Sequence, residues 1–188
     1  MHKSLMRNQF IEALIKLIPQ YGWSVEAMQK AAILLDRDPE YHQILFPDGV
    51  SEAREFYEAM MDAKMLEMLA EMPRPDKIRE RIGFALKVRI IDLKSSYKNP
   101  SIKSIWSTAD AIWYYAGDVS TDFNHYTKRG LLSAVYIASK RHYAKDDSEG
   151  FKDTEEFIAR SIEKVLKIAS IKYKMPKMED IPILRLFS

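Results

Sequence analysis

The stretch that most constrains the fold of this chain is WYYAGDVSTDFNHYTKRG, residues 113–130. Three adjacent aromatic residues precede Gly117, and acidic and hydroxyl-bearing side chains follow it before a new helical pattern begins. A glycine directly after an apolar-periodic run typically ends a helix, and Thr121 or Asp122 is placed to cap the next one. We therefore predict a corner between two helices, over residues 102–116 and 122–144.

The side chains of this corner allow three interpretations: a catalytic site, for which no motif is evident in the chain, a structural turn and a docking surface. Turn chemistry explains the glycine and the polar residues but leaves the crowded aromatic residues unexplained. On a helix that starts at 122, spacings of three and four place four side chains on one face, and aromatic and arginine side chains are typical of protein-binding surfaces. These four are Asp122, His125, Tyr126 and Arg129.

Apolar residues recur at helical spacing along the rest of the chain. We predict helices over 4–21, 25–36, 39–46, 51–72, 76–96, 102–116, 122–144 and 154–173. Gly22 is expected to end the first helix and Ser24 to cap the second, while Asp153 and Glu156 fit a capping box at the last. Prolines at 47, 73, 75 and 100 separate other segments. Because no extended alternation of apolar and polar residues indicates a strand, we predict an all-α fold.

The first three helices resemble a helix-turn-helix unit, and a large helical domain follows them, as in TetR-like repressors. Residues 1–60 contain six Lys or Arg against nine Asp or Glu, a net charge of −3. The segment DPEYHQILFPD, residues 38–48, contains neither Lys nor Arg. A helix that reads DNA must neutralise phosphates, so we expect a degenerate module over 1–50 and no nucleic acid partner.

Composition excludes several chemistries. The chain has 188 residues, 47% of them apolar and 30% charged, with a net charge of +2 and no cysteine. Disulfides and thiolate catalysis are therefore excluded, and the four histidines show no metal-ligand spacing. No nucleophile elbow or phosphate loop is evident. We expect no catalytic residue, no metal and no cofactor. No apolar run reaches the length of about 20 residues that spans a bilayer, and no secretory signal is expected.

The corner also carries a family resemblance. ADAIWYYAGDVSTDFNHYTKRGLLSAVYIAS at 109–139 and DDSEGFKDTEEFIARSIEKV at 146–165 resemble the ubiquinone (coenzyme Q) biosynthesis accessory lipid-binding proteins. YGWSVEAMQKAA at 21–32 and LFPDG at 45–49 extend the resemblance over most of residues 8–170. It implies a TetR-like homodimer that no longer reads DNA. It also implies an apolar cavity for an isoprenoid precursor within residues 51–175, and presentation of that lipid to the di-iron demethoxyubiquinone hydroxylase.

The resemblance assigns candidate site residues by position. The surface that contacts the hydroxylase falls on Asn124, His125 and Tyr126, beside Asp122 and Arg129 on the same helical face. His125 replaces the usual tryptophan, which implies either weaker docking or a co-adapted partner. For the lipid we expect apolar positions on the helices that flank the corner: Leu86, Ile90, Ile105, Ile112, Trp113, Leu132, Val135 and Tyr136.

Two further features concern assembly and location. Gly130, Ala134 and Ala138 form a strip of small side chains along which a second helix or subunit can approach closely. Residues 176–188 form an apolar tail, in which Pro176 and Pro182 prevent one continuous helix. The resemblance implies that this tail attaches the chain to the cytoplasmic face of a bacterial inner membrane; packing of the tail on its own domain is the alternative. The alternative function is that of a TetR-like, ligand-responsive transcription regulator.

Overall fold

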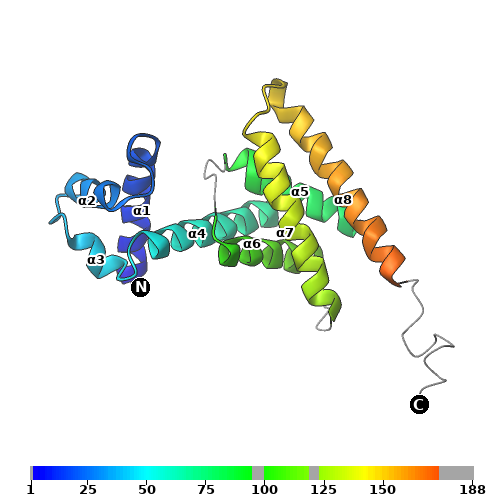
Figure 1. The fold of residues 1–188 in the computed structure, drawn as a ribbon, viewed down its shortest axis with the longest axis horizontal. Coiled ribbons are helices and arrows are strands. Elements are labelled where there is room, and N and C mark those ends of the chain that lie inside the picture. Colours follow the sequence, from blue (N-terminus) through cyan, green and yellow to red (C-terminus); the bar gives the residue numbers. More distant parts are fainter. Residues whose placement is uncertain (1, 95–99, 119–122, 174–188) are drawn as a thin grey trace, which may run out of the picture. The chain divides into compact units, whose positions relative to one another are not determined.

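The structure is a computed structural model that describes residues 2–94, 100–118 and 123–173. The side chains of residues 2, 123, 124 and 168–173 are not described. Within these ranges the chain is helical and contains no strand (Figure 1), so the predicted all-α class is confirmed. The α-helices are α1 (His2–Tyr21), α2 (Val25–Leu34), α3 (Tyr41–Leu45), α4 (Val50–Glu71), α5 (Ile78–Lys87), α6 (Ile102–Ala116), α7 (Phe123–Tyr143) and α8 (Lys152–Tyr173). A π-helix, η1 (Val88–Asp92), and a 3₁₀ turn, η2 (Glu149–Phe151), complete the order.

By packing, the chain divides into two compact units. One contains Met1–Lys64 with Asn99–Ser104, and the other contains Met65–Lys98 with Ile105–Ser188. The packing boundary therefore lies inside α4. The division that we predict at residue 50 separates functional modules, and packing does not test it. The predicted tail over 176–188 lies outside the described residues.

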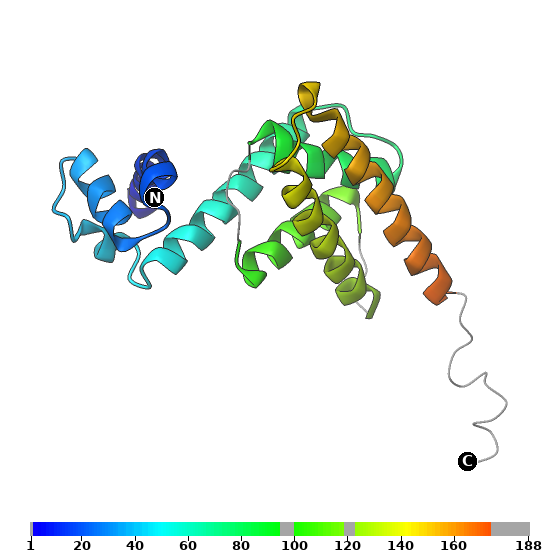
Figure 2. The same cartoon turned by 45° about the horizontal axis from the view of Figure 1, so that its top comes forward.

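The N-terminal unit has the predicted helix-turn-helix order (blue helices in Figure 2). Gly22 ends α1 with a φ of +63°, and its N–H donates to the Ile18 carbonyl at 2.9 Å. Ser24 caps α2, because its hydroxyl oxygen accepts from the Ala27 N–H at 3.1 Å. Both predicted caps are therefore confirmed. The core of this unit is apolar and includes Phe10, Ile11, Leu14, Met28, Leu45 and Phe46.

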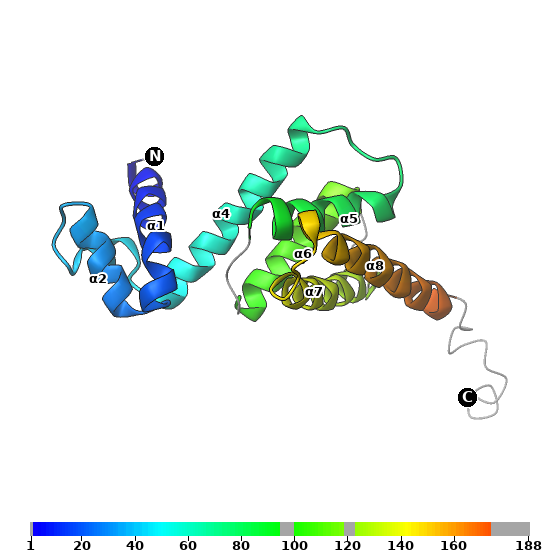
Figure 3. The same cartoon turned by 90° about the horizontal axis from the view of Figure 1, so that it is seen from above.

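The C-terminal unit packs α8 against α7 and α5 over a single apolar core, and Figure 3 shows these three helices side by side. The helix predicted over 76–96 is present over residues 78–92, but it changes type within that range. An α-helix ends at Lys87 and a π-helix follows, closed by a hydrogen bond of 3.0 Å from the Leu93 N–H to the Val88 carbonyl. The wider turn buries four consecutive residues, Val88 to Ile91, which an α-helix at the edge of a core does not do.

The start of α8 also differs from the prediction. The helix begins at Lys152, so Asp153 lies inside its first turn and is not the cap. Asp146 serves instead: its carboxylate accepts from the backbone N–H groups of Ser148 and Thr154, both at 2.8 Å, and from both hydroxyls. The hydrogen bonds from Ser148 and then Thr154 hold the pKa of Asp146 well below its usual range. A loop carboxylate six residues before the helix therefore caps the start of α8 in place of the predicted capping box.

Candidate functional site

The corner between α6 and α7 begins with a glycine that the backbone requires. Gly117 has a φ of +92°, and a Cβ there would lie 3.4 Å from Nη1 of Arg81. The Gly117 N–H donates to the Tyr114 carbonyl, and the Asp118 N–H donates to the Trp113 carbonyl, each at 3.0 Å. This double closure is the Schellman arrangement that ends a helix and directs the chain away. The predicted end of α6 is confirmed.

Two arginines from an earlier segment complete this helix end. Arg74 donates to the Tyr115 carbonyl at 2.6 Å, and Arg81 donates to the Ala116 carbonyl at 3.0 Å. Their positive charge also favours the negative end of the helix dipole. Sequence reasoning missed both residues because their partners lie 41 and 35 positions further along the chain.

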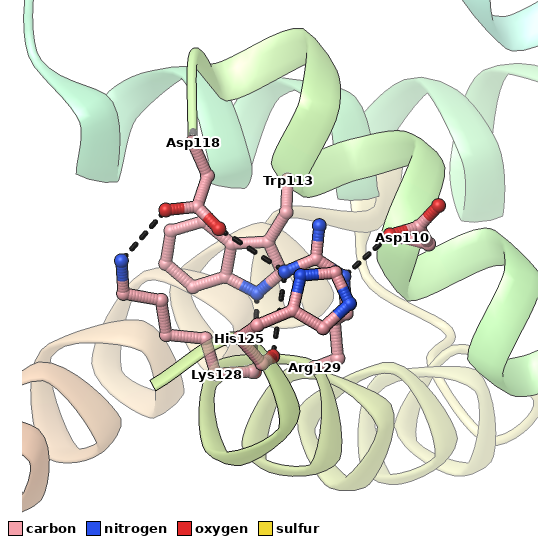
Figure 4. A network of polar contacts seen from close by, with 6 residues as sticks. All are labelled: Asp110, Trp113, Asp118, His125, Lys128 and Arg129. Carbon is pink, nitrogen blue, oxygen red and sulfur yellow. Dashed lines mark hydrogen bonds and ion pairs between the residues drawn. The ribbon is translucent and has the colours of Figure 1, made fainter. Parts of the chain in front are cut away.

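A charged network links α6 to α7 beneath the corner (Figure 4). The Asp118 carboxylate, whose side chain is only 6% exposed, accepts from Lys128 at 2.6 Å and from Arg129 at 3.1 Å. Arg129 also forms an ion pair with Asp110 through Nε and donates to the His125 carbonyl at 3.3 Å. One acidic side chain after α6 and another inside it therefore hold the first turns of α7.

Trp113 joins the same network from α6. Its indole N–H donates to the Lys128 carbonyl at 3.1 Å, and the Lys128 ammonium lies 5.4 Å from the centre of the indole ring (Figure 4). The indole therefore combines a hydrogen bond to α7 with a cation–π contact, and it belongs to the buried core as well. Trp113, predicted as a lipid contact, therefore also holds α6 against the first turns of α7.

The predicted docking residues separate into a surface layer and a buried layer. Tyr126 is 63% exposed, and His125 is half-buried. The two rings meet edge to face, at an angle of 73° and with 5.2 Å between their centres. Arg129 is only 4% exposed and lies beneath them. Asp122 lies outside the described residues, and Asn124 lies in the first turn of α7 with its side chain not described. The docking role of all five residues stays a prediction.

One aromatic neighbour of Tyr126 was not predicted. The ring of Trp106, on α6, lies 6.2 Å from the ring of Tyr126, and Trp106 is half-buried. Trp106 and Asp110 are four residues apart, so they share one face of α6. In the sequence, the four-residue spacing between Trp106 and Asp110 is the signal that could have identified Trp106. The pairing of Asp110 with Arg129 on α7 is visible only in the structure.

The eight predicted lipid contacts all lie in one buried core of the C-terminal unit. Each is at most 9% exposed, and they come from α5, the π-helix, α6 and α7. The structure thus brings them together, in contact with one another and with residues such as Ile82, Ile158 and Ile162. Their role in lipid binding stays a prediction.

A pocket of about 470 Å³ lies between α5 and α8, and none of the eight residues lines it. Its apolar part is continuous with the core, since Ile158 and Ile162 belong to both. Lys87 and Glu155 form an ion pair of 2.6 Å at its polar rim, and this hydrogen bond raises the pKa of Lys87. The lining residues are Arg79, Glu80, Gly83, Phe84, Lys87, Glu155, Ile158, Ala159, Ile162 and Glu163.

Two features are absent from the residues that the structure describes. No group of three or more His, Cys, Asp or Glu side chains there could hold a metal ion. Among the helices that the structure describes, none is long and apolar enough to cross a bilayer.

Comparison with known proteins gives one consistent family. Residues 99–169, which contain the corner and most of α8, match the family profile described as COQ9. The chain is 26% identical to the probable ubiquinone biosynthesis protein coq9, mitochondrial, of Dictyostelium discoideum, over 95% of this chain and 64% of that protein. It is 27% and 25% identical to the ubiquinone biosynthesis proteins COQ9, mitochondrial, of Bos taurus and Homo sapiens, over 84% of this chain and 56% of each.

The chain therefore spans less than two thirds of the length of these relatives. A crystal structure of a TetR transcriptional regulator from Nitrosomonas europaea is similar in fold, with a TM-score of 0.62 and 14% identity over 86% of this chain and 98% of that chain. Both the predicted family resemblance and the predicted TetR-like fold are confirmed.

Proposed function

We propose that this chain, as a relative of the COQ9 proteins, takes part in ubiquinone biosynthesis as a non-catalytic, lipid-binding accessory protein. The observation that carries this proposal is the match over residues 99–169, because it encloses the whole corner and its charged network. In this proposal the protein moves and presents an isoprenoid precursor, and the di-iron demethoxyubiquinone hydroxylase performs the reaction.

The pocket between α5 and α8 supports the lipid part of the proposal. Its volume of about 470 Å³ lies within the range of small-molecule sites, about 300–1,000 Å³. An isoprenoid gains about 0.8 kcal/mol for each buried CH₂, so it needs an apolar surface outside the bilayer. Phe84, Ile158, Ala159 and Ile162 supply such a surface in this pocket. We propose that the lipid enters here, with its polar end at the charged rim, and reaches the eight predicted contacts by displacing side chains of the continuous core.

The exposed rings on α7 and α6 support the docking part. Tyr126 lies on the surface above a rigid base, because Arg129 is fixed by Asp110 and Asp118 beneath it. Aromatic side chains on a pre-organised surface commonly dominate protein interfaces. We propose that Tyr126, His125 and Trp106 contact the hydroxylase, and that His125 is matched by a change in that partner.

This docking role is tested by capture of the purified hydroxylase on the immobilised chain of 188 residues. Tyr126→Lys should reduce capture about tenfold or more, which is the size of an interface hot spot, and should leave the melting temperature within about 2 °C. Tyr114→Lys is the matched control, since Tyr114 is 78% exposed on α6. Equal capture by both variants, or a large fall in melting temperature for Tyr126→Lys, would show that Tyr126 does not dock the partner.

We further propose a membrane attachment and a homodimer contact. The apolar tail, residues 176–188, attaches the chain to a membrane surface, which we place at the cytoplasmic face of a bacterial inner membrane. The strip of Gly130, Ala134 and Ala138 forms the contact of a homodimer. A Cβ added to Gly130 would meet nothing within 4 Å among the residues that the structure describes, which supports an approach of a second copy along this part of the strip.

The alternative function, a ligand-responsive transcription regulator, is favoured by the fold match alone. The net charge of −3 over residues 1–60 opposes it, because DNA binding requires positive charge near the phosphates. Gel-shift titrations at several salt concentrations separate the two functions. Nanomolar binding to a specific sequence with a steep salt dependence would establish the regulator and overturn the accessory role.

A further inference from the structure

The helix-turn-helix unit exposes apolar side chains where a DNA-reading module presents polar ones. Ile33 and Leu34, in the last turn of α2, are 55% and 58% exposed, and Ile44 on α3 is 66% exposed. Isolated apolar side chains on a surface are ordinary, but three of them on two adjoining helices need an explanation.

A hydrogen bond between α2 and α3 brings the faces that carry Ile33 and Ile44 to one surface. Gln29 on α2 donates to the Glu40 carboxylate, at the start of α3, at 2.8 Å. Ile33 lies one helical turn after Gln29, and Ile44 lies one turn after Glu40, so each isoleucine shares a face with one end of this hydrogen bond. The outer faces of α2 and α3 therefore join at Glu40. We call this surface, formed by Ile33, Leu34, Glu40 and Ile44, the acidic corner.

Negative charge predominates around the acidic corner, and Lys30, one turn before Ile33 and Leu34 on α2, forms an ion pair with Glu26 at 3.8 Å. Residues 36–48 contain four exposed acidic side chains, Asp36, Asp38, Glu40 and Asp48, against one basic side chain, Arg37. The Arg37 guanidinium lies 5.7 Å from the centre of the Tyr41 ring, so it is directed toward its own helix-turn-helix unit. A surface of this charge repels nucleic acid phosphates and anionic lipid headgroups. It is complementary to a protein surface that carries Lys or Arg around apolar residues.

We propose that the acidic corner is a docking surface for a basic, amphipathic helix of a partner protein. The apolar stripe of that helix covers Ile33, Leu34 and Ile44, and its Lys or Arg side chains face Asp36, Glu40 and Asp48. This interaction surface belongs to the N-terminal unit. It does not depend on the lipid pocket or on the Tyr126 surface of the proposed function, so its test can fail without affecting them.

The test uses a fluorescein-labelled 18-residue helical peptide of Leu and Lys at amphipathic spacing. Fluorescence anisotropy measures its binding to the full chain. Ile44→Ser and Glu40→Gln should each weaken binding about tenfold, as loss of a hot-spot contact does. Glutamine at position 40 removes the charge and retains an oxygen that accepts from Gln29. Leu34→Ser is the second apolar variant, and circular dichroism checks that each variant is folded.

Matched controls come from α1, a different helix of the same unit that carries the same residue types. Leu5 is 59% exposed, and Glu12 is exposed. Leu5→Ser and Glu12→Gln should change the peptide affinity less than about twofold, as contacts outside a hot spot do. Raising NaCl from about 0.05 M to about 0.5 M should weaken binding to the native chain more than to Glu40→Gln, because salt screens the removed charge pair.

Three results would overturn the proposal. The first is equal weakening by the control variants, which would show attraction to the net charge alone. The second is equal binding of a peptide in which Glu replaces Lys. The third is loss of co-sedimentation with phosphatidylglycerol vesicles in Ile44→Ser but not in Leu5→Ser, which would identify the acidic corner as a lipid contact.

Discussion

At the scale of single residues, Arg129 shows why a shared helical face does not identify a surface. The spacing of His125, Tyr126 and Arg129 is correct on α7, and Tyr126 is exposed as predicted. Arg129, however, turns inward, because Asp110 and Asp118 on the α6 side offer two carboxylates. Helical periodicity gives the direction of each side chain around one axis, but the partners across the interface decide which direction is buried.

The buried pair between Arg129 and Asp118 makes a testable difference to stability. Arg129→Met should reduce the free energy of unfolding by about 1–3 kcal/mol, because it removes a charged donor from the buried Asp118 carboxylate, which keeps Lys128 as its remaining cation. Urea denaturation measures this loss. Arg141→Met, at an exposed position near the end of the same helix, is the matched control and should change stability by less than about 0.5 kcal/mol. Similar losses in the two variants would mean that the Arg129 pair adds nothing to stability.

At the scale of helices and turns, the sequence was informative wherever a local signal marks a boundary. Gly22, Ser24 and Gly117 act through their own backbone or neighbouring N–H groups, and all three were predicted. The π-helix was not predicted, because its extra residue per turn depends on packing; Arg89, fully buried there, lies 5.8 Å from the Tyr136 ring. The pocket was missed for a similar reason: its lining comes from two helices far apart in sequence.

The turn before α8 gives a prediction about pH. Hydrogen bonds from Ser148 and Thr154 lower the pKa of Asp146 in the folded chain relative to about 3.9 in the unfolded chain. A lowered folded pKa stabilises the fold above the unfolded pKa, and this contribution is lost as pH falls through about 4 toward the folded value. Asp146→Asn should therefore be less stable than the native chain at pH 7, and this difference should shrink below about pH 4.

Urea midpoints measured from about pH 7 to about pH 3 provide the comparison. Asp147→Asn is the matched control, since Asp147 is the exposed neighbour in the same loop, and its difference from the native chain should stay small and flat. A constant difference for Asp146→Asn across the whole range would contradict the role of its carboxylate as the acceptor in this turn.

At the scale of the whole molecule, we predict a homodimer through the small side chains of α7. Ala134 is exposed and lies one turn after Gly130, so Ala134→Arg should block close approach of a second helix. Analytical ultracentrifugation should show a dimer for the native chain and a monomer for this variant, with equal helicity by circular dichroism. Ala63→Arg, at an exposed alanine of α4, should remain dimeric. A native chain that sediments as a monomer would refute the dimer.

The function of the whole molecule was predicted from a family resemblance and not from a visible site. Composition and spacing excluded cysteine chemistry and opposed DNA binding, but apolar core residues and lipid contacts have the same sequence pattern. The pattern therefore selected eight residues that lie together in the buried core. The pocket lies elsewhere, between α5 and α8, and none of the eight lines it.

The most direct test of lipid binding is mass spectrometry of lipids extracted from the purified chain of 188 residues. We predict an isoprenoid quinone precursor in an amount close to one per chain. Ala159→Trp, which fills the pocket, should reduce this amount about tenfold, whereas Ala59→Trp on an exposed face of α4 should retain it. An extract without any isoprenoid, or equal lipid in both variants, would contradict the claim that this helical unit shelters a lipid in the pocket between α5 and α8.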